Sequence, residues 1–385
     1  MTPAARVAAA IDVLDTWRDG VAAERALTQW ARKSRFAGSK DRAAVRDHVY
    51  DVLRCHDTAV AFGGGDSGRA LMLGLLRSRG EEIGAYFSGV GYGPDPLTQD
   101  EIDFTPPPPG TWDWNMPDWL VNTLKASLGE KAKEAAGVLQ GRAPITVRCN
   151  LRKSDMQSAI RQLAEDQISA VPNAIADTAL TITNGARRLR NTPAYLDGSV
   201  ELQDAASQAV VALLPAGRHC LDYCAGGGGK ALAIAAQKER NVYAHDENPD
   251  RMKDIAPRAD RAGVTVTQIA GQELGQHAPF GLVLCDVPCS GSGAWRRSPE
   301  GKWALTAERL AELQDIQLDV LNDAAALVAD KGWLVYATCS ILKPENEDAI
   351  ARFLTLNSGW RCTFEKRFDV SSEGDGFYTA HLTRD

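Results

Sequence analysis

Apolar residues up to about position 95 recur three and four positions apart, which is the spacing of an amphipathic helix. Val7, Ile11 and Leu14 show this spacing, and residues 43–53 repeat it. Glycine-rich stretches at residues 63–68 and 89–97 interrupt the pattern. We therefore predict that this region consists entirely of helices.

A proline-rich segment, FTPPPPGTW at residues 104–112, follows the helical region. Consecutive prolines keep a chain extended and act as a semi-rigid spacer. MPDWLVNTLKASLG comes next at residues 116–129, with Pro117 where a first helical turn tolerates proline. The sequence therefore predicts a helical domain at residues 1–105 and a proline-rich linker with a helical connector at residues 106–144.

From residue 145 the period of the apolar residues changes. ITVRCNL at 145–151 and TALTIT at 178–183 alternate as strands do, and SDMQSAIRQLAEDQ at 154–167 has helical spacing. We predict a small α+β unit over residues 145–198.

Residues 199–385 alternate between short apolar runs and helical stretches. The runs expected to be strands are HCLDYC, NVYAHD, VTVTQI, GLVLCD and WLVYAT, followed by WRCTFEKRFD and GFYTAHLTR at the end of the chain. Alternation of strands and helices is typical of an α/β fold with a mostly parallel, doubly wound sheet and helices on both faces.

Composition limits the possible classes of protein. A net charge of −7 over 385 residues argues against a protein whose whole surface binds polyanions. Basic residues nevertheless gather at positions 24–54, 186–190 and 296–297, in patterns that suit either phosphate contacts or an ordinary solvated surface. No apolar run reaches the roughly 18 residues of a membrane span. Asp12 and Asp15 interrupt the N-terminal apolar stretch, so we expect no export signal, no membrane contact and a cytoplasmic location.

The eight cysteines do not have the spacing of a metal site. None of them forms a C-x-x-C pair, and no cluster of cysteine and histidine has zinc spacing. We expect no bound metal and mostly reduced, buried thiols.

The stretch LDYCAGGGGKALAIAA at residues 221–236 predicts a strand, a glycine loop and a helix. Glycines let the backbone approach a ligand closely, and a helix N-terminus favours hydrogen-bond acceptors. A P-loop would need glycine in place of Cys224 and serine or threonine in place of Ala231. S-adenosylmethionine fits better, with Asp246 at the end of the next strand as the acid for the ribose, although a packing turn would use glycines too.

Two cysteines follow two strand-like runs. Asp286 ends GLVLCD with Cys289 just beyond it, and Cys339 ends WLVYATC. Ligands of an open parallel sheet bind beyond the carboxyl ends of its strands, so both thiols are expected at one pocket. Methylation of carbon 5 of a pyrimidine needs thiol and carboxyl groups together at one site. A thiolate that adds to carbon 6 makes carbon 5 nucleophilic. A carboxyl group stabilises the adduct and a base removes the C5 proton.

Several motifs are similar to those of the RsmB/Nop/Sun family of RNA cytosine-5 methyltransferases. DVPCSGSGAWRRSPEGKW at residues 286–303 and ATCS at 337–340 resemble its two signature motifs, and ELQDAASQAV and GDGFYTAHLTR resemble flanking ones. KDRAAVRDHVYDVLR is similar to the NusB-like RNA-binding domain of the bacterial branch, and residues 145–198 resemble its RRM-like unit. The resemblance covers nearly the whole chain and implies a Rossmann-like methyltransferase domain at residues 199–385.

The resemblance also implies roles for single residues. Cys339 would be the nucleophile, Cys289 would assist breakdown of the adduct, and Asp286 would contact the cytosine edge or lie beside the cofactor. The cofactor S-adenosyl-L-methionine would be bound by Cys224, Ala225, Gly226, Gly227, Gly228, Gly229, Lys230, Asp246, Glu247 and Arg251.

Three stretches depart from the family pattern. Gly226 and Gly227 replace an Ala-Pro pair, and Gly281 stands where aspartate is common. AGQEL replaces a Gly-Asp pair, so either Gln272 or Glu273 must contact the adenine, and the amide of Gln272 can both donate and accept hydrogen bonds.

We expect a monomeric enzyme that methylates carbon 5 of a cytosine in RNA, with small-subunit rRNA as the substrate. Methylation of tRNA or another RNA, and a non-catalytic role as an RNA-binding ribosome assembly factor, remain open alternatives. A DNA cytosine-5 methyltransferase is less consistent with the motifs, because its nucleophile lies in the Pro-Cys motif and Cys339 would not be needed.

Overall fold

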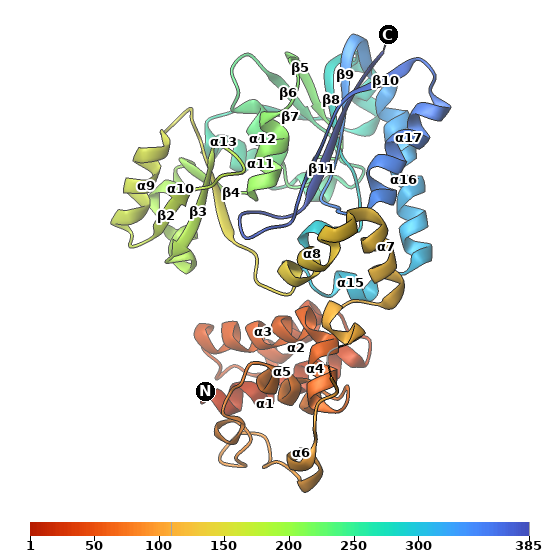
Figure 1. Ribbon diagram of the computed structural model, residues 1–385. Coiled ribbons are helices and arrows are strands. Elements are labelled where there is room, and N and C mark those ends of the chain that lie inside the picture. Colours follow the sequence, from red (N-terminus) through yellow and green to blue (C-terminus); the bar gives the residue numbers. More distant parts are fainter. Residues whose placement is uncertain (109, 385) are drawn as a thin grey trace. The chain divides into compact units, whose positions relative to one another are not determined.

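The strands of the C-terminal region form a mostly parallel sheet in the order β10-β11-β9-β8-β5-β6-β7 (Figure 1). The computed structural model describes residues 1–108 and 110–384. The strands are β5 (His219–Asp222), β6 (Asn241–Ala244), β7 (Val266–Gln268), β8 (Phe280–Asp286), β9 (Val328–Thr338), β10 (Trp360–Phe368) and β11 (Phe377–Arg384). β5 to β9 run parallel, whereas β10 and β11 pair antiparallel at one side. The predicted α/β fold is confirmed.

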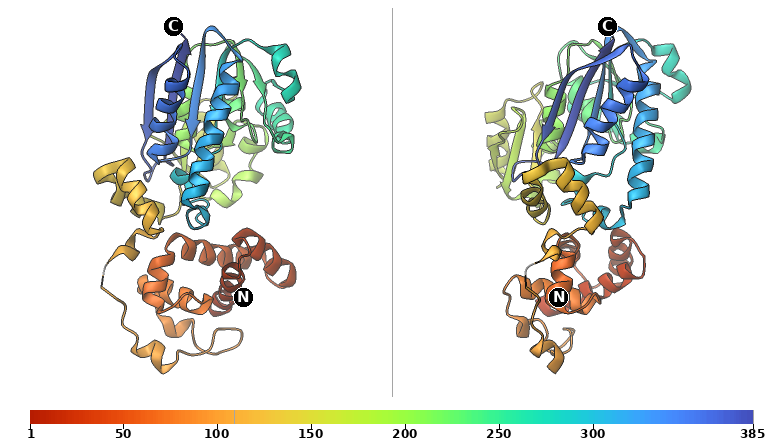
Figure 2. Two further views of the ribbon diagram at one scale, coloured as in Figure 1. Left: turned by 90° about the vertical axis from the view of Figure 1, so that its right-hand side faces the viewer. Right: turned by 45° about the vertical axis from the view of Figure 1, so that its right-hand side comes forward.

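Helices separate the strands and cover both faces of this sheet. They are α11 (Ala205–Ala212), α12 (Gly229–Ala235), α13 (Ile255–Ala262), α14 (Leu274–His277), α16 (Ala307–Ala325) and α17 (Glu347–Leu356). Alternate residues of a strand point to opposite faces. Leu282 and Leu284 of β8 therefore pack in one core with α11 and α12, while Val283 and Cys285 pack in a second core with α16 and α17. Figure 2 shows helices on both sides of this sheet.

A smaller antiparallel sheet in the order β2-β3-β1-β4 precedes the parallel one. Its elements are β1 (Ile145–Cys149), α9 (Met156–Glu165), β2 (Ser169–Pro172), β3 (Ala179–Asn184), α10 (Pro193–Leu196) and β4 (Val200–Leu202). The sequence predicted β1, α9 and β3 but missed β2 and β4. β2 is a largely exposed edge strand without an apolar alternation, and β4 is too short to show a period.

The N-terminal residues form the predicted helical bundle. Its helices are α1 (Pro3–Arg18), α2 (Ala23–Lys33), α3 (Ser39–Arg54), α4 (His56–Gly63) and α5 (Gly68–Ser78), followed by α6 (Gln99–Asp103), α7 (Asp118–Leu128) and α8 (Ala132–Leu139). The predicted glycine-rich break at residues 63–68 lies between α4 and α5. None of the helices in the described residues has the length and apolar character that crossing a membrane requires.

The described chain divides into two compact units. The helical unit comprises Met1–Lys125, Glu130–Arg142 and Trp295–Ala304, and the sheet unit comprises the rest. Trp295–Ala304, which includes α15 (Gly301–Ala304), therefore belongs with the bundle although it follows β8 in sequence.

Hydrogen bonds explain why this segment packs with the helices. The Lys302 ammonium donates to the Arg54 carbonyl oxygen over 2.8 Å, and the Trp303 indole N–H donates to the Leu53 carbonyl oxygen over 2.7 Å. Glu300 accepts from the Trp17 indole N–H at 3.0 Å. Burial lowers the pKa of Lys302 to about 8. Nothing in the periodicity of the sequence indicates this long-range pairing.

Glycine allows α4 and α5 to pack closely. A Cβ atom on Gly74 of α5 would lie 1.8 Å from the carbonyl oxygen of Ala59, and one on Gly63 would lie 2.0 Å from that of Ala70. Both neighbours are backbone atoms, which cannot move aside without shifting a helix.

We predict that Gly74→Ala destabilises the protein by about 1–3 kcal/mol, because overpacking forces the helices apart. Thermal unfolding of the full chain measures this. Gly137→Ala in α8 is the matched control, since a Cβ there meets no atom within 4 Å and alanine favours a helix by about 0.8–1 kcal/mol. A Gly74→Ala protein as stable as the wild type would contradict the close packing of α4 and α5.

Candidate active site

The two cysteines singled out from the sequence meet at the carboxyl end of the sheet. β8 and β9 are parallel neighbours with Asp286 opposite Ala337, so the loops that follow them leave the same edge. Cys289 lies in the first loop and Cys339 in the second, and their Sγ atoms are 3.5 Å apart. The Gly293 N–H donates to the Cys339 carbonyl oxygen at 2.9 Å and joins the loops through the backbone.

The two thiols differ in their electrostatic surroundings. The contact with the Cys339 sulfur raises the pKa of the Cys289 thiol, and burial and the Glu345 carboxylate raise it further. Cys339 is instead among the groups that raise the pKa of Lys230, so a positive charge lies near its sulfur. Cys289 is therefore suited to keep its proton and donate it to the Cys339 sulfur.

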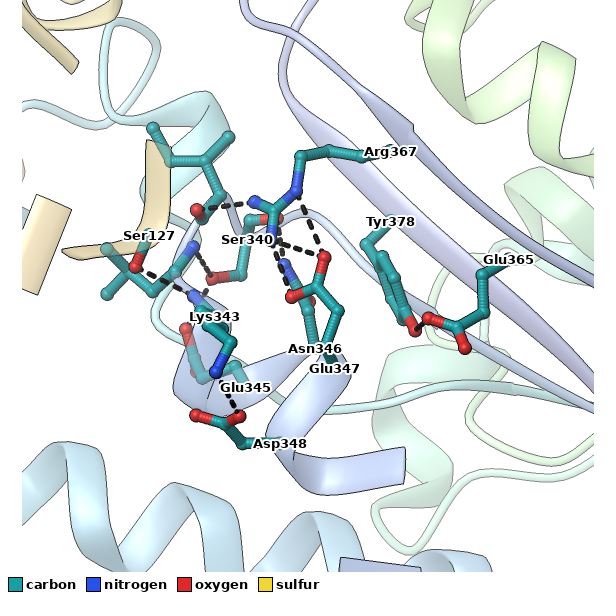
Figure 3. Close-up of polar contacts among 12 residues, drawn as sticks. Ser127, Ser340, Lys343, Glu345, Asn346, Glu347, Asp348, Glu365, Arg367 and Tyr378 are labelled. Atoms are coloured by element: carbon teal, nitrogen blue, oxygen red, sulfur yellow. Dashed lines mark hydrogen bonds and ion pairs between the residues drawn. The ribbon is translucent and has the colours of Figure 1, made fainter. Parts of the chain in front are cut away.

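A buried carboxylate, Glu345, fixes both cysteine loops. Its side chain is 0% exposed. Oε1 accepts from the Ser290 N–H at 2.7 Å and from the Gln317 amide at 3.1 Å. Oε2 accepts from the hydroxyls of Ser290 and Ser340, both at 2.5 Å (Figure 3 shows the bond from Ser340). Ser290 follows Cys289 and Ser340 follows Cys339, so one carboxylate holds the residues next to both thiols.

Further polar contacts hold the loop after β9. The Thr338 hydroxyl donates to Asn346 Oδ1 at 2.6 Å. Arg367 of β10 forms an ion pair with Glu347 at 2.6 Å and donates to the Ile341 carbonyl oxygen at 2.6 Å (Figure 3). These bonds leave the backbone around Cys339 little freedom, so the thiol is presented in a fixed position.

An ion pair connects the glycine loop to the cysteine site. Lys230, in the first turn of α12, donates to Asp286 Oδ2 at 2.6 Å. Although burial opposes the charge, the Asp286 carboxylate raises the pKa of Lys230. The ammonium therefore stays charged beside Asp286, and the pair brings together two residues that lie 56 positions apart in the sequence.

The predicted glycine loop lies between β5 and α12. Gly226 has φ +50° and Gly228 has φ +79°, which are left-handed conformations that favour glycine. A Cβ on Gly228 would lie 2.7 Å from an Ile255 carbon. Cys224 and Ala225 begin the loop, the Ala225 N–H donates to the His245 carbonyl oxygen at 2.8 Å, and burial raises the pKa of the Cys224 thiol.

Asp246 follows β6 and holds this loop in place. Its Oδ2 accepts from the Gly226 N–H at 2.9 Å and its Oδ1 from the Asn248 N–H at 3.0 Å. The Arg251 guanidinium pairs with the same carboxylate at 3.1 Å. Glu247 beside it is exposed. The carboxylate that the sequence suggested for a ribose thus also organises the glycine loop.

The two residues considered for the adenine differ in their surroundings. Glu273 accepts from the Ala270 N–H at 2.8 Å, so its carboxylate caps its own helical turn. Gln272 is exposed. Contact of either side chain with the adenine stays a prediction.

Sequence reasoning missed Asp222, the last residue of β5. It is 1% exposed, and among the described residues neither carboxyl oxygen has a well-formed hydrogen bond. Burial raises the pKa of Asp222 to about 7 and Asp286 adds to the rise, while the Lys230 ammonium and the Ala231 amide act in the opposite direction. A carboxyl group just before the glycine loop could have identified this position.

The residues around the glycine loop fit a ligand with a positively charged group. The buried carboxyl oxygens of Asp222 can accept hydrogen bonds, but no described side chain donates a well-formed one to them. The ammonium group of a ligand would be a suitable donor. No group of three or more His, Cys, Asp and Glu side chains suited to a metal ion occurs in the described part of the chain.

Asp222 should make stability depend on pH. Its folded-state pKa of about 7 lies above the ordinary value of 3.8, so its contribution is complete below pH about 4 and is lost as the pH rises through about 7. The side chain of Asp222→Asn is neutral at every pH. The free energy of unfolding of this variant should therefore not show the decrease, on the order of a few kcal/mol, that the wild type shows over this pH range. Thermal unfolding of the full chain from about pH 4 to 8 measures the difference.

Asp330→Asn is the matched control for this experiment, because Asp330 is exposed. Identical pH profiles for wild type and Asp222→Asn would mean that the Asp222 carboxyl has no perturbed pKa.

Comparison with known proteins identifies the family. A model of the family described as 16S rRNA methyltransferase RsmB/F matches residues 210–383, and a model of the RsmF/B-like ferredoxin-like domain matches residues 116–187. Ribosomal RNA small subunit methyltransferase B of Xylella fastidiosa is 30% identical over 292 residues, which cover 70% of this chain and 67% of that protein. Its counterpart in Vibrio cholerae is 33% identical over 289 residues, covering 70% and 66%. The chain thus spans about two thirds of the length of these relatives.

Solved structures show the same fold. The crystal structure of PH0851 aligns with a TM-score of 0.76 at 22% identity and covers 100% of this chain and 99% of that chain. NSun6 from Pyrococcus horikoshii with SFG aligns with a TM-score of 0.61 at 16% identity, covering 70% and 98%. Together with the matches in sequence, these findings show that the chain belongs to the RsmB/F family of 16S rRNA methyltransferases.

Proposed function

We propose that this protein transfers a methyl group from S-adenosylmethionine to carbon 5 of a cytosine in small-subunit rRNA. The contact of 3.5 Å between the thiols of Cys289 and Cys339, at the carboxyl ends of neighbouring strands, carries this proposal. The family description and the names of the curated relatives support rRNA as the substrate.

Cys339 is the proposed nucleophile. Its sulfur adds to carbon 6 of the cytosine and forms a C–S bond, and the electron pair of the C5–C6 double bond makes carbon 5 nucleophilic. The Lys230 ammonium interacts electrostatically with Cys339 and places a positive charge near the attacking sulfur. The hydrogen-bonded backbone around Thr338 and Asn346 keeps the sulfur in position.

Cys289 is proposed to act in the second half of the reaction. Carbon 5 must lose its proton before the C–S bond to Cys339 can break and the double bond can form again. The raised pKa keeps the Cys289 thiol protonated, and the contact of 3.5 Å keeps it beside the reacting sulfur. Cys289 therefore assists the departure of Cys339 by donating a proton to its sulfur as the C–S bond breaks, while the C5 proton passes to water.

Asp286 is proposed to hold the edge of the cytosine. A carboxylate can accept a hydrogen bond from the exocyclic amino group, and a carboxyl group can stabilise charge that develops at N3. The Lys230 ammonium fixes Asp286 Oδ2 from one side. Lys230 therefore positions Asp286, and it also offsets negative charge between Asp286 and Cys339.

The residues proposed to hold the cofactor surround the glycine loop. Cys224 to Lys230 and Asp222 would surround the methionine part, Asp246 with Glu247 and Arg251 the ribose, and Gln272 the adenine. S-adenosylmethionine, when bound, supplies an electrophilic methyl group. The unmet acceptor capacity of Asp222 and the left-handed glycines support this assignment.

The two cysteines should behave differently when mutated. Cys339→Ala should lose nearly all methyl transfer and form no covalent complex with RNA, because no thiol attacks carbon 6. Cys289→Ala should still attack, but the adduct should resolve slowly and survive denaturing electrophoresis. Incubation of each full-length variant with rRNA and S-adenosylmethionine, followed by such a gel, separates the two roles.

The double variant Cys289→Ala/Cys339→Ala is the control and should show no covalent complex. An adduct in Cys339→Ala and none in Cys289→Ala would reverse the assignment. Activity in both single variants without an adduct would exclude covalent catalysis.

Asp246→Ala should weaken binding of S-adenosylmethionine by roughly 5- to 150-fold, because loss of a buried acceptor costs about 1–3 kcal/mol. Titration calorimetry on the full chain measures the affinity. Asp250→Ala is the control, since Asp250 is exposed and four residues away. Equal affinities for Asp246→Ala and wild type would place the ribose elsewhere.

A further inference from the structure

A large apolar cavity lies in the helical unit. It has a volume of about 1120 Å³ and is formed by α1, α2 and the loop around residues 90–92. This volume exceeds the roughly 300–1,000 Å³ of a typical small-molecule pocket. The small side chains of Ala5, Ala8 and Ala9 in α1 contribute to its lining.

Aromatic side chains at this cavity are unusually exposed. Phe36 is 77% exposed and Tyr92 is 89% exposed, and both line the cavity together with Trp30. Exposed apolar surface of this kind marks a binding site on a folded protein. Asp12 and Gln29 add polar groups to the lining.

The segment of the chain that contains Trp30 and Phe36 is strongly basic, and Lys33 of this segment lines the cavity. Positions 23–46 contain seven basic and two acidic residues, in a chain whose net charge is −7. Both acids have partners, because Glu24 accepts from the Tyr50 hydroxyl and Asp41 pairs with Arg6. Arg32, Lys33 and Arg35 adjoin or belong to the cavity lining, are exposed, and form no ion pair within residues 1–108 and 110–384.

We propose that this cavity binds unstacked bases of single-stranded RNA, with Phe36, Tyr92 and Trp30 as stacking surfaces. Flat aromatic faces beside unpaired cations are the combination that single-stranded nucleic acids need, since bases stack while phosphates meet positive charge. An apolar peptide segment would use the apolar surface but not the excess of cations. The inference rests on RNA as the substrate of the proposed function and identifies where a single-stranded segment of that RNA is held.

The test measures binding of the full-length protein to a labelled single-stranded RNA of about 12 nucleotides by fluorescence anisotropy. Phe36→Ala/Tyr92→Ala should bind it about tenfold or more weakly, with an unchanged salt dependence. Lys33→Gln/Arg35→Gln should instead reduce the salt slope by roughly 1.4, because two phosphate contacts are lost. A duplex of the same sequence should not respond to the aromatic substitutions.

Two further variants distinguish base stacking from general apolar contact. Phe36→Leu/Tyr92→Leu keeps the apolar surface but lacks the aromatic faces, so it should bind RNA as weakly as the alanine variant. Ile102→Ala, which removes another exposed apolar side chain, should bind as the wild type does. RNA that carries 4-thiouridine should crosslink on irradiation to peptides containing residues 30–36 or Tyr92.

Wild-type affinity in the alanine variant would overturn the proposal, and so would an absence of RNA binding by the full chain. Wild-type affinity in the leucine variant would assign the cavity to an apolar partner such as a peptide. The outcome is separate from the proposed catalysis, because anisotropy is read without S-adenosylmethionine. Aromatic-dependent binding without methylation would refute only the proposed function, and an adduct at Cys339 with no effect of the aromatic variants would refute only this site.

Discussion

The arrangement of the site depends on one buried carboxylate. Glu345 is fully buried, and removing a charged group from water costs several kcal/mol unless hydrogen bonds compensate. Donors from both cysteine loops and from Gln317 of α16 supply that compensation. Because hydrogen bonds to a charged group contribute about 1.5–3 kcal/mol each, any separation of the loops would leave the carboxylate with unmet acceptor capacity. The contact between the two thiols is therefore a consequence of how Glu345 is satisfied.

The same arrangement makes two chemically identical side chains different. The contact with the Cys339 sulfur, burial and the Glu345 carboxylate raise the pKa of Cys289, whereas the Lys230 ammonium places a positive charge near Cys339. A thiol that keeps its proton beside the proposed nucleophile is the asymmetry that the proposed reaction requires. Lys230 lies in α12, the helix that begins at the glycine loop, and it also pairs with Asp286. This one side chain therefore connects the glycine loop to the cysteine site.

Much of the fold follows from the sequence, because apolar period and glycine position are local properties. The runs around β5, β6, β8 and β9, the glycine loop and the cysteines at strand ends could be read directly. Asp222, the Glu345 network and the packing of Trp295–Ala304 with the helices could not, since each depends on residues far apart in the chain. The exposed edge strand β2 lacked the alternation that would have revealed it. The boundaries predicted for the domains and the roles of individual site residues stay predictions.

The most direct test of the account is to find which sulfur becomes bonded to the base. RNA containing 5-fluorocytosine has no C5 proton to lose, so an adduct formed during methylation cannot resolve and accumulates on the wild-type protein. Digestion and mass spectrometry then identify the peptide that carries the nucleotide. The account predicts the nucleotide on Cys339 and an unmodified Cys289. A nucleotide on Cys289, or an active protein with no modified cysteine, would contradict it.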